Sequence, residues 1–227
     1  MKEIRIIPVT GVPEVMAGDD LGALLHAALP LPLEDMDVVV VTQKVVSKAE
    51  GRVIAETDRI RAAEDESVRV LRRAGEMIIS ETRHGFVCAN SGVDASNVAE
   101  GTIALLPLDP DLSARRLRAQ LKHVGGVDVG VIVSDTFGRA WRRGQTDVAI
   151  GVAGIDPFID YRGTTDTFGR ELSATQIAVA DQLAGAAEMV MGKTERVCAA
   201  VVRGASVVAG SGSAADLVRP HEEDLFR

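Results

Sequence analysis

The chain has 227 residues, a length that suits one large domain or two smaller lobes. Hydrophobic residues make up 46% of the chain, which is enough for a substantial core and excludes a disordered polymer. The formal net charge is -8 at pH 7, so a duplex nucleic-acid binder, which would present a basic face, is not expected. Small anionic substrates stay compatible, because a metal ion and a few arginines can reverse the sign locally.

The two cysteines, Cys88 and Cys198, are far apart and form no Cys-x-x-Cys pair. Neither a disulfide framework nor a structural zinc site is therefore supported, and two reduced thiols fit a cytoplasmic protein. No apolar run approaches the ~20 residues of a membrane span, so no membrane partner is expected. The charges of Lys2, Glu3 and Arg5 would interrupt the apolar part of an export signal.

The first fifty residues predict a strand, a helix and a second strand. Residues 4–9 read as the first strand, and Asp20 is placed to cap a helix with apolar side chains at helical spacing over 21–29, ended by Pro30. Residues 38–41 are four consecutive valines, which predicts a strand buried on both faces. Lys44 and Lys48 follow it, four positions apart and so on one side of a helix. A solvated face and a phosphate-binding face both explain them.

The next segment mixes a charged helix with short strands. A helix is expected over residues 63–74, ended by Gly75, with short strands over 78–79 and 86–89. The loop 90–97 carries Asp94 and Asn97. These are ordinary turn residues, but divalent metals in phosphoryl-transfer sites also bridge carboxylates from separate loops. Residues 105–108 read as a strand, and Asp109 with Pro110 starts a helix that ends at residues 125–126.

The stretch 127–147 is the centre of the interpretation. An apolar, β-branched run over 127–133 predicts a buried strand, which is expected to stop at Asp135 and Thr136. A loop with three arginines and the only Trp of the chain should follow. Hard oxygen ligands hold Mg²⁺ or Mn²⁺, arginines bind phosphate or carboxylate oxygens, and phosphoryl transfer needs both. A strand exit with solvated charges is the alternative.

The last third predicts strands over 148–152, 155–161 and 197–202, and a polar loop over 162–171. Residues 173–176 have the pattern of a capping box and predict the start of a helix that ends at Gly192. Its expected buried face is Ile177, Ala180, Ala184, Ala187 and Met191. Residues 191–194 are similar to the end of a phosphate-binding P-loop, but the first glycine of that motif is missing and the segment closes a helix instead of opening one.

Six short blocks, spread in order along the chain, resemble one enzyme family. The blocks are residues 8–13, 43–51, 91–97, 134–139, 144–147 and 161–163. Together they resemble the γ-glutamyl ligase of the deazaflavin coenzyme F-420, over essentially the whole chain. The resemblance implies an α+β fold with mixed sheets and flanking helices in two lobes, and an intertwined homodimer.

The resemblance also implies site residues. Asp94, Asp135 and Thr136 look like metal ligands. The residues that look like nucleotide contacts are Val12, Pro13, Glu14, Val15, Gln43, Lys48, Asn97, Gly192 and Lys193. Asp135 and Lys48 are expected to be catalytic, and Arg139 joins them because a guanidinium can pair with a substrate carboxylate.

The reaction implied by the resemblance is a GTP-dependent ligation. L-glutamate would be added to the lactyl carboxylate of the deazaflavin coenzyme precursor through an acyl phosphate, and further γ-linked glutamates would follow. The implied cofactors are two divalent ions, Mg²⁺ or Mn²⁺, together with K⁺. Two alternatives use the same residues: a metal-dependent phosphohydrolase or nucleotidase, and a non-catalytic nucleotide-binding dimer.

One γ-glutamyl ligase domain is expected over residues 1–227. Its end, residues 219–227, resembles the junction to a nitroreductase-like domain in two-domain members of the family.

Overall fold

The computed structural model describes residues 3–225. Met1 and Lys2, at the charged N-terminus, and Phe226 and Arg227, at the end of the junction-like segment, lie outside the described residues. The elements in chain order are β1 (Arg5–Val9), α1 (Leu21–Ala27), β2 (Val38–Thr42), α2 (Gln43–Ala49), β3 (Val53–Ala55), α3 (Arg59–Asp65), β4 (Ser67–Ala74), β5 (Met77–Thr82), β6 (Val87–Ala89), η1 (Asn90–Gly92), β7 (Thr102–Ala104), α4 (Pro110–Gly125), β8 (Gly130–Arg139), β9 (Arg142–Ala153), β10 (Phe158–Asp160), β11 (Gln176–Ala178), α5 (Val179–Met191), β12 (Ala199–Arg203), η2 (Ala214–Leu217) and η3 (His221–Glu223).

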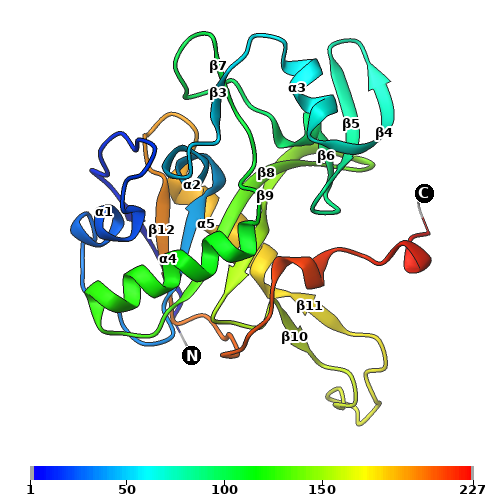
Figure 1. The fold of residues 1–227 in the computed structure, drawn as a ribbon. Helices are drawn as coiled ribbons and strands as arrows, with labels where there is room; N and C mark the ends of the chain where they lie inside the picture. The colour runs from blue at the N-terminus through cyan, green and yellow to red at the C-terminus, as the bar shows by residue number, and fades with distance from the viewer. Residues whose placement is uncertain (1–2, 226–227) are drawn as a thin grey trace.

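A five-stranded mixed sheet in the order β1-β12-β2-β8-β9 forms the centre of the molecule (Figure 1). Only β2 and β8 are parallel, and the other neighbours are antiparallel. The predicted α+β class with mixed sheets and flanking helices is confirmed. The division into two lobes and the homodimer stay predictions. Within residues 3–225, no helix combines the length and the apolar character of a membrane span.

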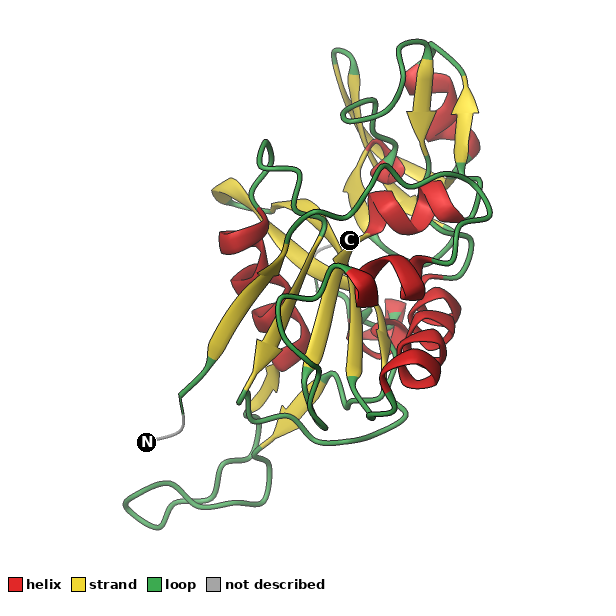
Figure 2. Ribbon diagram, turned by 90° about the vertical axis from the view of Figure 1, so that its left-hand side faces the viewer, coloured by secondary structure: helices red, strands yellow, loops and turns green. Residues whose placement is uncertain are grey.

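The four valines of β2 are apolar without alternation because helices cover both faces of the sheet (Figure 2). Val39 and Val41 pack with α1 and α4, through side chains such as Leu25 and Leu121. Val38 and Val40 belong to the opposite core, which α5 covers. The face of α5 predicted to be buried is confirmed at Ala180, Ala184, Ala187 and Met191.

The predicted helix caps are correct at α1 and α4. The Asp20 carboxylate accepts a hydrogen bond from the backbone N–H of Ala23 at 3.0 Å, and Asp109 accepts one from Leu112 at 2.8 Å. Gly126 follows α4 with φ 73°, a backbone conformation that favours glycine. α1 stops at Ala27, earlier than the proline that was expected to end it.

The helix predicted over residues 63–74 is wrong. Asp58 caps a helix that starts earlier, α3, and the charged residues after it form strand β4. Strand β4 pairs with β5, and the Arg69–Glu81 salt bridge of 2.9 Å joins the two strands. A highly charged segment is compatible with an exposed helix and with an exposed strand. Pairing with β5 determines that this segment forms a strand. The short strands expected over 78–79 and 86–89 are present as β5 and β6.

Strand β8 does not stop at Asp135, as expected, but runs on to Arg139. Residues 140 and 141 then turn the chain into β9, and Trp141 adopts φ 58° at the turn. The stretch expected to be a loop is thus a long β-hairpin, in which Thr136 lies opposite Asp147. Backbone pairing along β9 fixes these side chains, which a loop would leave free.

The capping box predicted over residues 173–176 does not start a helix. Gln176 begins strand β11, which pairs with β10 in an arm that extends away from the body (Figures 1 and 2). Helix α5 starts only at Val179, without a side-chain cap, so Ile177 lies in the strand. The strand predicted over 155–161 is shortened to β10, and residues 105–108 lie beyond the end of β7.

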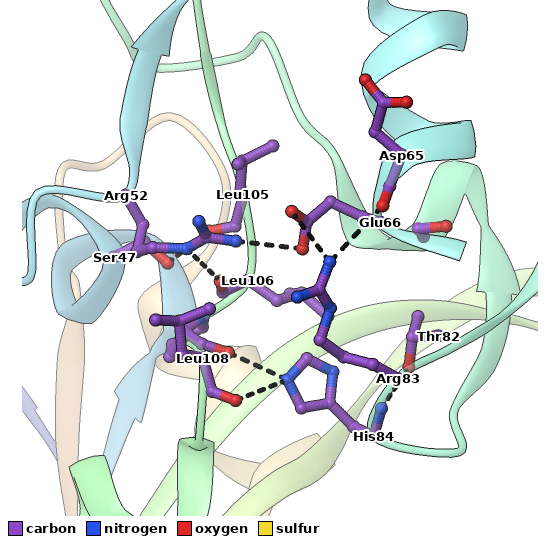
Figure 3. A network of polar contacts seen from close by, with 12 residues as sticks. Ser47, Arg52, Asp65, Glu66, Thr82, Arg83, His84, Leu105, Leu106 and Leu108 are labelled. Carbon is purple, nitrogen blue, oxygen red and sulfur yellow. Dashed lines mark hydrogen bonds and ion pairs between the residues drawn. The ribbon is translucent and has the colours of Figure 1, made fainter. Parts of the chain in front are cut away.

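A polar network joins the small sheets to the body of the molecule (Figure 3). Arg52 pairs with Glu66 at 2.9 Å and donates to the carbonyl of Leu106 at 3.0 Å. His84 Nε2 lies 3.0 and 3.1 Å from the carbonyl oxygens of Pro107 and Leu108, so Nε2 must carry the proton. Burial lowers the pKa of His84, and its buried Nδ1 has no hydrogen-bond partner among residues 3–225.

The His84 contact should make stability depend on pH. Because the pKa of the folded-state imidazole lies below its ordinary value of 6.5, the contact should contribute fully above that pH and weaken as the pH falls below it. In His84→Gln an amide can replace the Nε2 donor and does not titrate. We expect the Tm of the wild type to drop relative to this variant, by a few degrees, between pH 8 and pH 5. A constant Tm difference would contradict the assignment.

Candidate active site

The parallel register of β2 and β8 creates the site. Thr42, at the end of β2, lies opposite Ser134 of β8. The residues that follow, Gln43 and Lys44 on one side and Asp135 on the other, therefore emerge at the same edge of the sheet. A cleft of about 1390 Å³ opens there, lined by parts of the stretches 12–17, 42–48, 89–99, 134–147 and 192–198.

Asp94 and Asp135, which come from different parts of the fold, both line this cleft. Burial, together with the negative charges of Asp147 and Asp94, raises the pKa of Asp135 to about 7. The carboxylates are thus close enough to repel one another. Asp135 forms no salt bridge within residues 3–225, so a cation supplied from solution would relieve this repulsion.

Asp94 is held by its neighbours. Lys44 Nζ contacts its Oδ2 at 2.7 Å, and the backbone N–H of Ser96 donates to its Oδ1 at 2.8 Å. Burial opposes ionisation, but the hydrogen bonds from Lys44 and Ser96 outweigh it and lower the pKa of Asp94. Asp94 is therefore ionised at neutral pH and already shares one oxygen with a cation.

Asp147 is a third carboxylate of the cleft, and sequence reasoning did not assign it a role. Only 2% of this residue is exposed, and its two oxygens accept hydrogen bonds from Ser134 at 3.0 Å and Thr136 at 2.5 Å. Lys193 Nζ lies 3.2 Å from it and 2.7 Å from the Thr136 hydroxyl. In the sequence, the block 144–147 includes Asp147 and could have indicated a role for it. The position of Asp147 opposite Thr136, however, depends on a β-hairpin in a stretch that was expected to be a loop.

Every predicted nucleotide contact lines the cleft, namely Val12, Pro13, Glu14, Val15, Gln43, Lys48, Asn97, Gly192 and Lys193. Lys48 forms a salt bridge with Glu14. Gln43 is buried, and its side-chain oxygen accepts a hydrogen bond from Ser47 at 2.9 Å. The segment 191–194 closes α5, as expected for a sequence that is not a P-loop.

Arg139 does not line the cleft. It lies at the exposed tip of the β8–β9 hairpin and donates to the carbonyl of Arg143 at 2.7 Å. Its catalytic role stays a prediction, without a contact to the other site residues.

The residues of the cleft fit a divalent cation. Asp94, Asp135 and Thr136 supply hard oxygen donors to one space, as Mg²⁺ and Mn²⁺ require. Within residues 3–225 no group of three His, Cys, Asp or Glu side chains is arranged to hold a metal. Substrate oxygens or water would therefore have to complete the coordination, as is usual for ions that bind with a nucleotide.

Both thiols are free, Cys88 inside the protein and Cys198 at the cleft. Burial raises the pKa of Cys88 to about 12 and that of Cys198 to about 11. Neither thiol is therefore available as a nucleophile or a thiolate ligand at neutral pH.

Residues 11–204 match the protein family described as F420-0:Gamma-glutamyl ligase. The chain is 40% identical over 249 aligned positions to the Coenzyme F420:L-glutamate ligase of Methanocaldococcus jannaschii, covering 100% of this chain and 99% of the relative. It is 41% identical to the enzyme of the same name from Methanothermobacter thermautotrophicus, covering 99% of each chain. A third relative of that name, from Methanococcus maripaludis strain C7, is 38% identical over 94% of each chain.

These similarities extend through the sheet and all the stretches that line the cleft, and the class they define is that of the ligases. Within that class, the chain belongs to the F420-0:Gamma-glutamyl ligase family.

The raised pKa of Asp135 predicts that metal binding depends on pH. A proton and a divalent ion compete for this carboxylate, so affinity should be highest above about pH 7, where the group is ionised without a metal. We expect the affinity for Mn²⁺, followed by electron paramagnetic resonance, to fall about tenfold per unit as the pH drops from 7 to 5. An Mn²⁺ affinity that is constant over this range would show that Asp135 is not a ligand.

Proposed function

We propose that the chain joins L-glutamate to the deazaflavin coenzyme precursor, the reaction after which its relatives are named. The observation that carries this proposal is one cleft that gathers Asp94, Asp135 and Thr136 with Lys48 and Lys193. Full-length similarity to three enzymes of that name supports it. We propose GTP as the co-substrate, because an amide does not form spontaneously from a carboxylate in water.

The proposed reaction has two steps. A carboxylate oxygen of the acceptor attacks the γ-phosphorus of GTP, and GDP leaves with the electron pair of the broken bond. The amine of L-glutamate then attacks the acyl-phosphate carbon, inorganic phosphate leaves, and the amine proton passes to solvent. Further γ-linked glutamates would be added by the same two steps, with the γ-carboxylate of the newly added glutamate as the acceptor.

The residues of the cleft have distinct roles in this proposal. Lys48 and Lys193 would offset charge on the nucleotide phosphates, and Asp94, Asp135 and Thr136 would hold two divalent ions, Mg²⁺ or Mn²⁺. Bound there, the ions would offset negative charge on the transferring phosphoryl group. Asp147 positions the Thr136 hydroxyl through its 2.5 Å hydrogen bond. K⁺ and the intertwined homodimer remain further predictions of the family resemblance.

Mass spectrometry tests the reaction. The full chain is incubated with the deazaflavin precursor, GTP, Mn²⁺ and L-glutamate, and the coenzyme should gain mass in steps of one glutamyl unit. Phosphate release that needs no glutamate would identify a phosphohydrolase instead. Binding of GTP without consumption, in the presence of acceptor and glutamate, would identify a non-catalytic nucleotide-binding module.

A substitution tests the site. Asp135→Asn should lower turnover by roughly 100-fold or more while the thermal melt stays cooperative, because the variant keeps the shape of the side chain and removes its charge. Glu76→Gln, in the exposed turn between β4 and β5, is the matched control and should keep full turnover. A folded Asp135→Asn protein with normal turnover would rule out the metal assignment.

A further inference from the structure

Each lysine that lines the cleft is paired with a carboxylate of the chain itself. Lys44 contacts Asp94, Lys48 contacts Glu14, and Lys193 contacts both Asp147 and Glu188. A nucleotide with its metal brings phosphate anions and cations into the same space. The phosphates can bind the lysines, and the cations can bind the carboxylates, only if the existing lysine–carboxylate ion pairs open. Binding therefore requires an exchange of ion pairs.

Lys44 is the lysine for which this exchange involves a carboxylate among the proposed metal ligands, because Lys193 contacts only the hydroxyl of Thr136 in that set. It lies in the first turn of α2, and only 16% of its side chain is exposed. Its ammonium contacts Asp94 Oδ2 at 2.7 Å and Ser96 Oγ at 2.6 Å. The other Asp94 oxygen accepts the Ser96 backbone N–H. The ammonium therefore occupies Oδ2 of Asp94, and both side chains line the cleft.

A divalent ion and this ammonium compete for the same oxygen. Two positive charges a few ångströms apart in a partly buried site repel strongly, and the carboxylate cannot serve both at full strength. The lysine stem has four rotatable bonds, so its ammonium can leave Asp94 without any movement of α2. Lys44 comes two positions after the end of β2, at the edge of the sheet where the cleft opens.

We propose that Lys44 is a metal-displaced phosphate ligand. Without nucleotide its ammonium holds the cation position at Asp94. When the divalent ion binds there, the ammonium turns to the phosphates of the nucleotide. This inference rests on the proposed function, in that it takes Asp94 to be a metal ligand and the nucleotide to bind in the same cleft.

The exchange links the two binding events. The free ammonium weakens metal binding when no phosphate is present to receive it, and a bound nucleotide removes that competition. By thermodynamic reciprocity, the metal must raise nucleotide affinity by the same factor. Lys48 offers a contrast within the same cleft, because its partner Glu14 is not among the proposed metal ligands.

Measurement of Mn²⁺ binding without catalysis tests the inference. Mn²⁺ is titrated into the full chain by electron paramagnetic resonance, with and without saturating GDP. In the absence of GDP, Lys44→Met should bind Mn²⁺ roughly tenfold more tightly than the wild type, because the competing charge is gone. With GDP this gain should disappear, and the affinity for GDP in the presence of Mn²⁺ should fall. A lysine with only a structural role would give no gain.

Three further variants complete the design. Lys48→Met should leave Mn²⁺ affinity in the absence of GDP unchanged, and Asp94→Asn should weaken it in every background. Lys44→Gln repeats the measurement with a polar side chain, should the methionine variant fail to fold. If neither Lys44 variant binds Mn²⁺ more tightly than a wild type that does bind it, the inference is wrong and the proposed function stands. If the wild type with GDP binds no Mn²⁺, the metal assignment of the proposed function fails, and the inference fails with it.

Discussion

The parallel pairing of β2 with β8 is the constraint on which the site depends. Among the strands of residues 3–225 it is the only parallel pair of the central sheet, and it brings two carboxyl ends of strands to one edge. Lys44 and Asp135 are 91 positions apart in the chain, yet this register places both of them at one cleft. The pairing is itself stabilised by helices on both faces of the sheet, which bury the valines of β2 completely.

Charge balance explains the character of the cleft. Three carboxylates, those of Asp94, Asp135 and Asp147, converge there, and within the described part of the chain lysine ammonium groups contact Asp94 and Asp147 but not Asp135. The pKa of Asp135 rises because burial and its neighbours both disfavour its charge. In the proposed function, a divalent ion at Asp135 would complete this neutralisation and allow an acidic chain to bind an anionic nucleotide.

Predictions from local sequence patterns are correct where the structure depends only on residues that are close in the sequence. Asp20 and Asp109 cap their helices because each needs only a backbone N–H three residues further on. The signals failed where pairing over distance competes with local preference. Residues 67–74 carry a charge pattern that suits a helix but pair with β5, and residues 176–178 form a strand although a capping pattern precedes them.

The sequence by itself determined the family, the buried strand 38–41, and most of the residues that line the cleft, because short blocks of polar residues and apolar runs are written directly in the chain. Only the tertiary structure decided that Asp147 faces Thr136, that Lys44 holds Asp94, and that Arg139 lies outside the cleft. The reason is that strand register and ion pairing join residues distant in sequence, and no local pattern encodes which partner each will find.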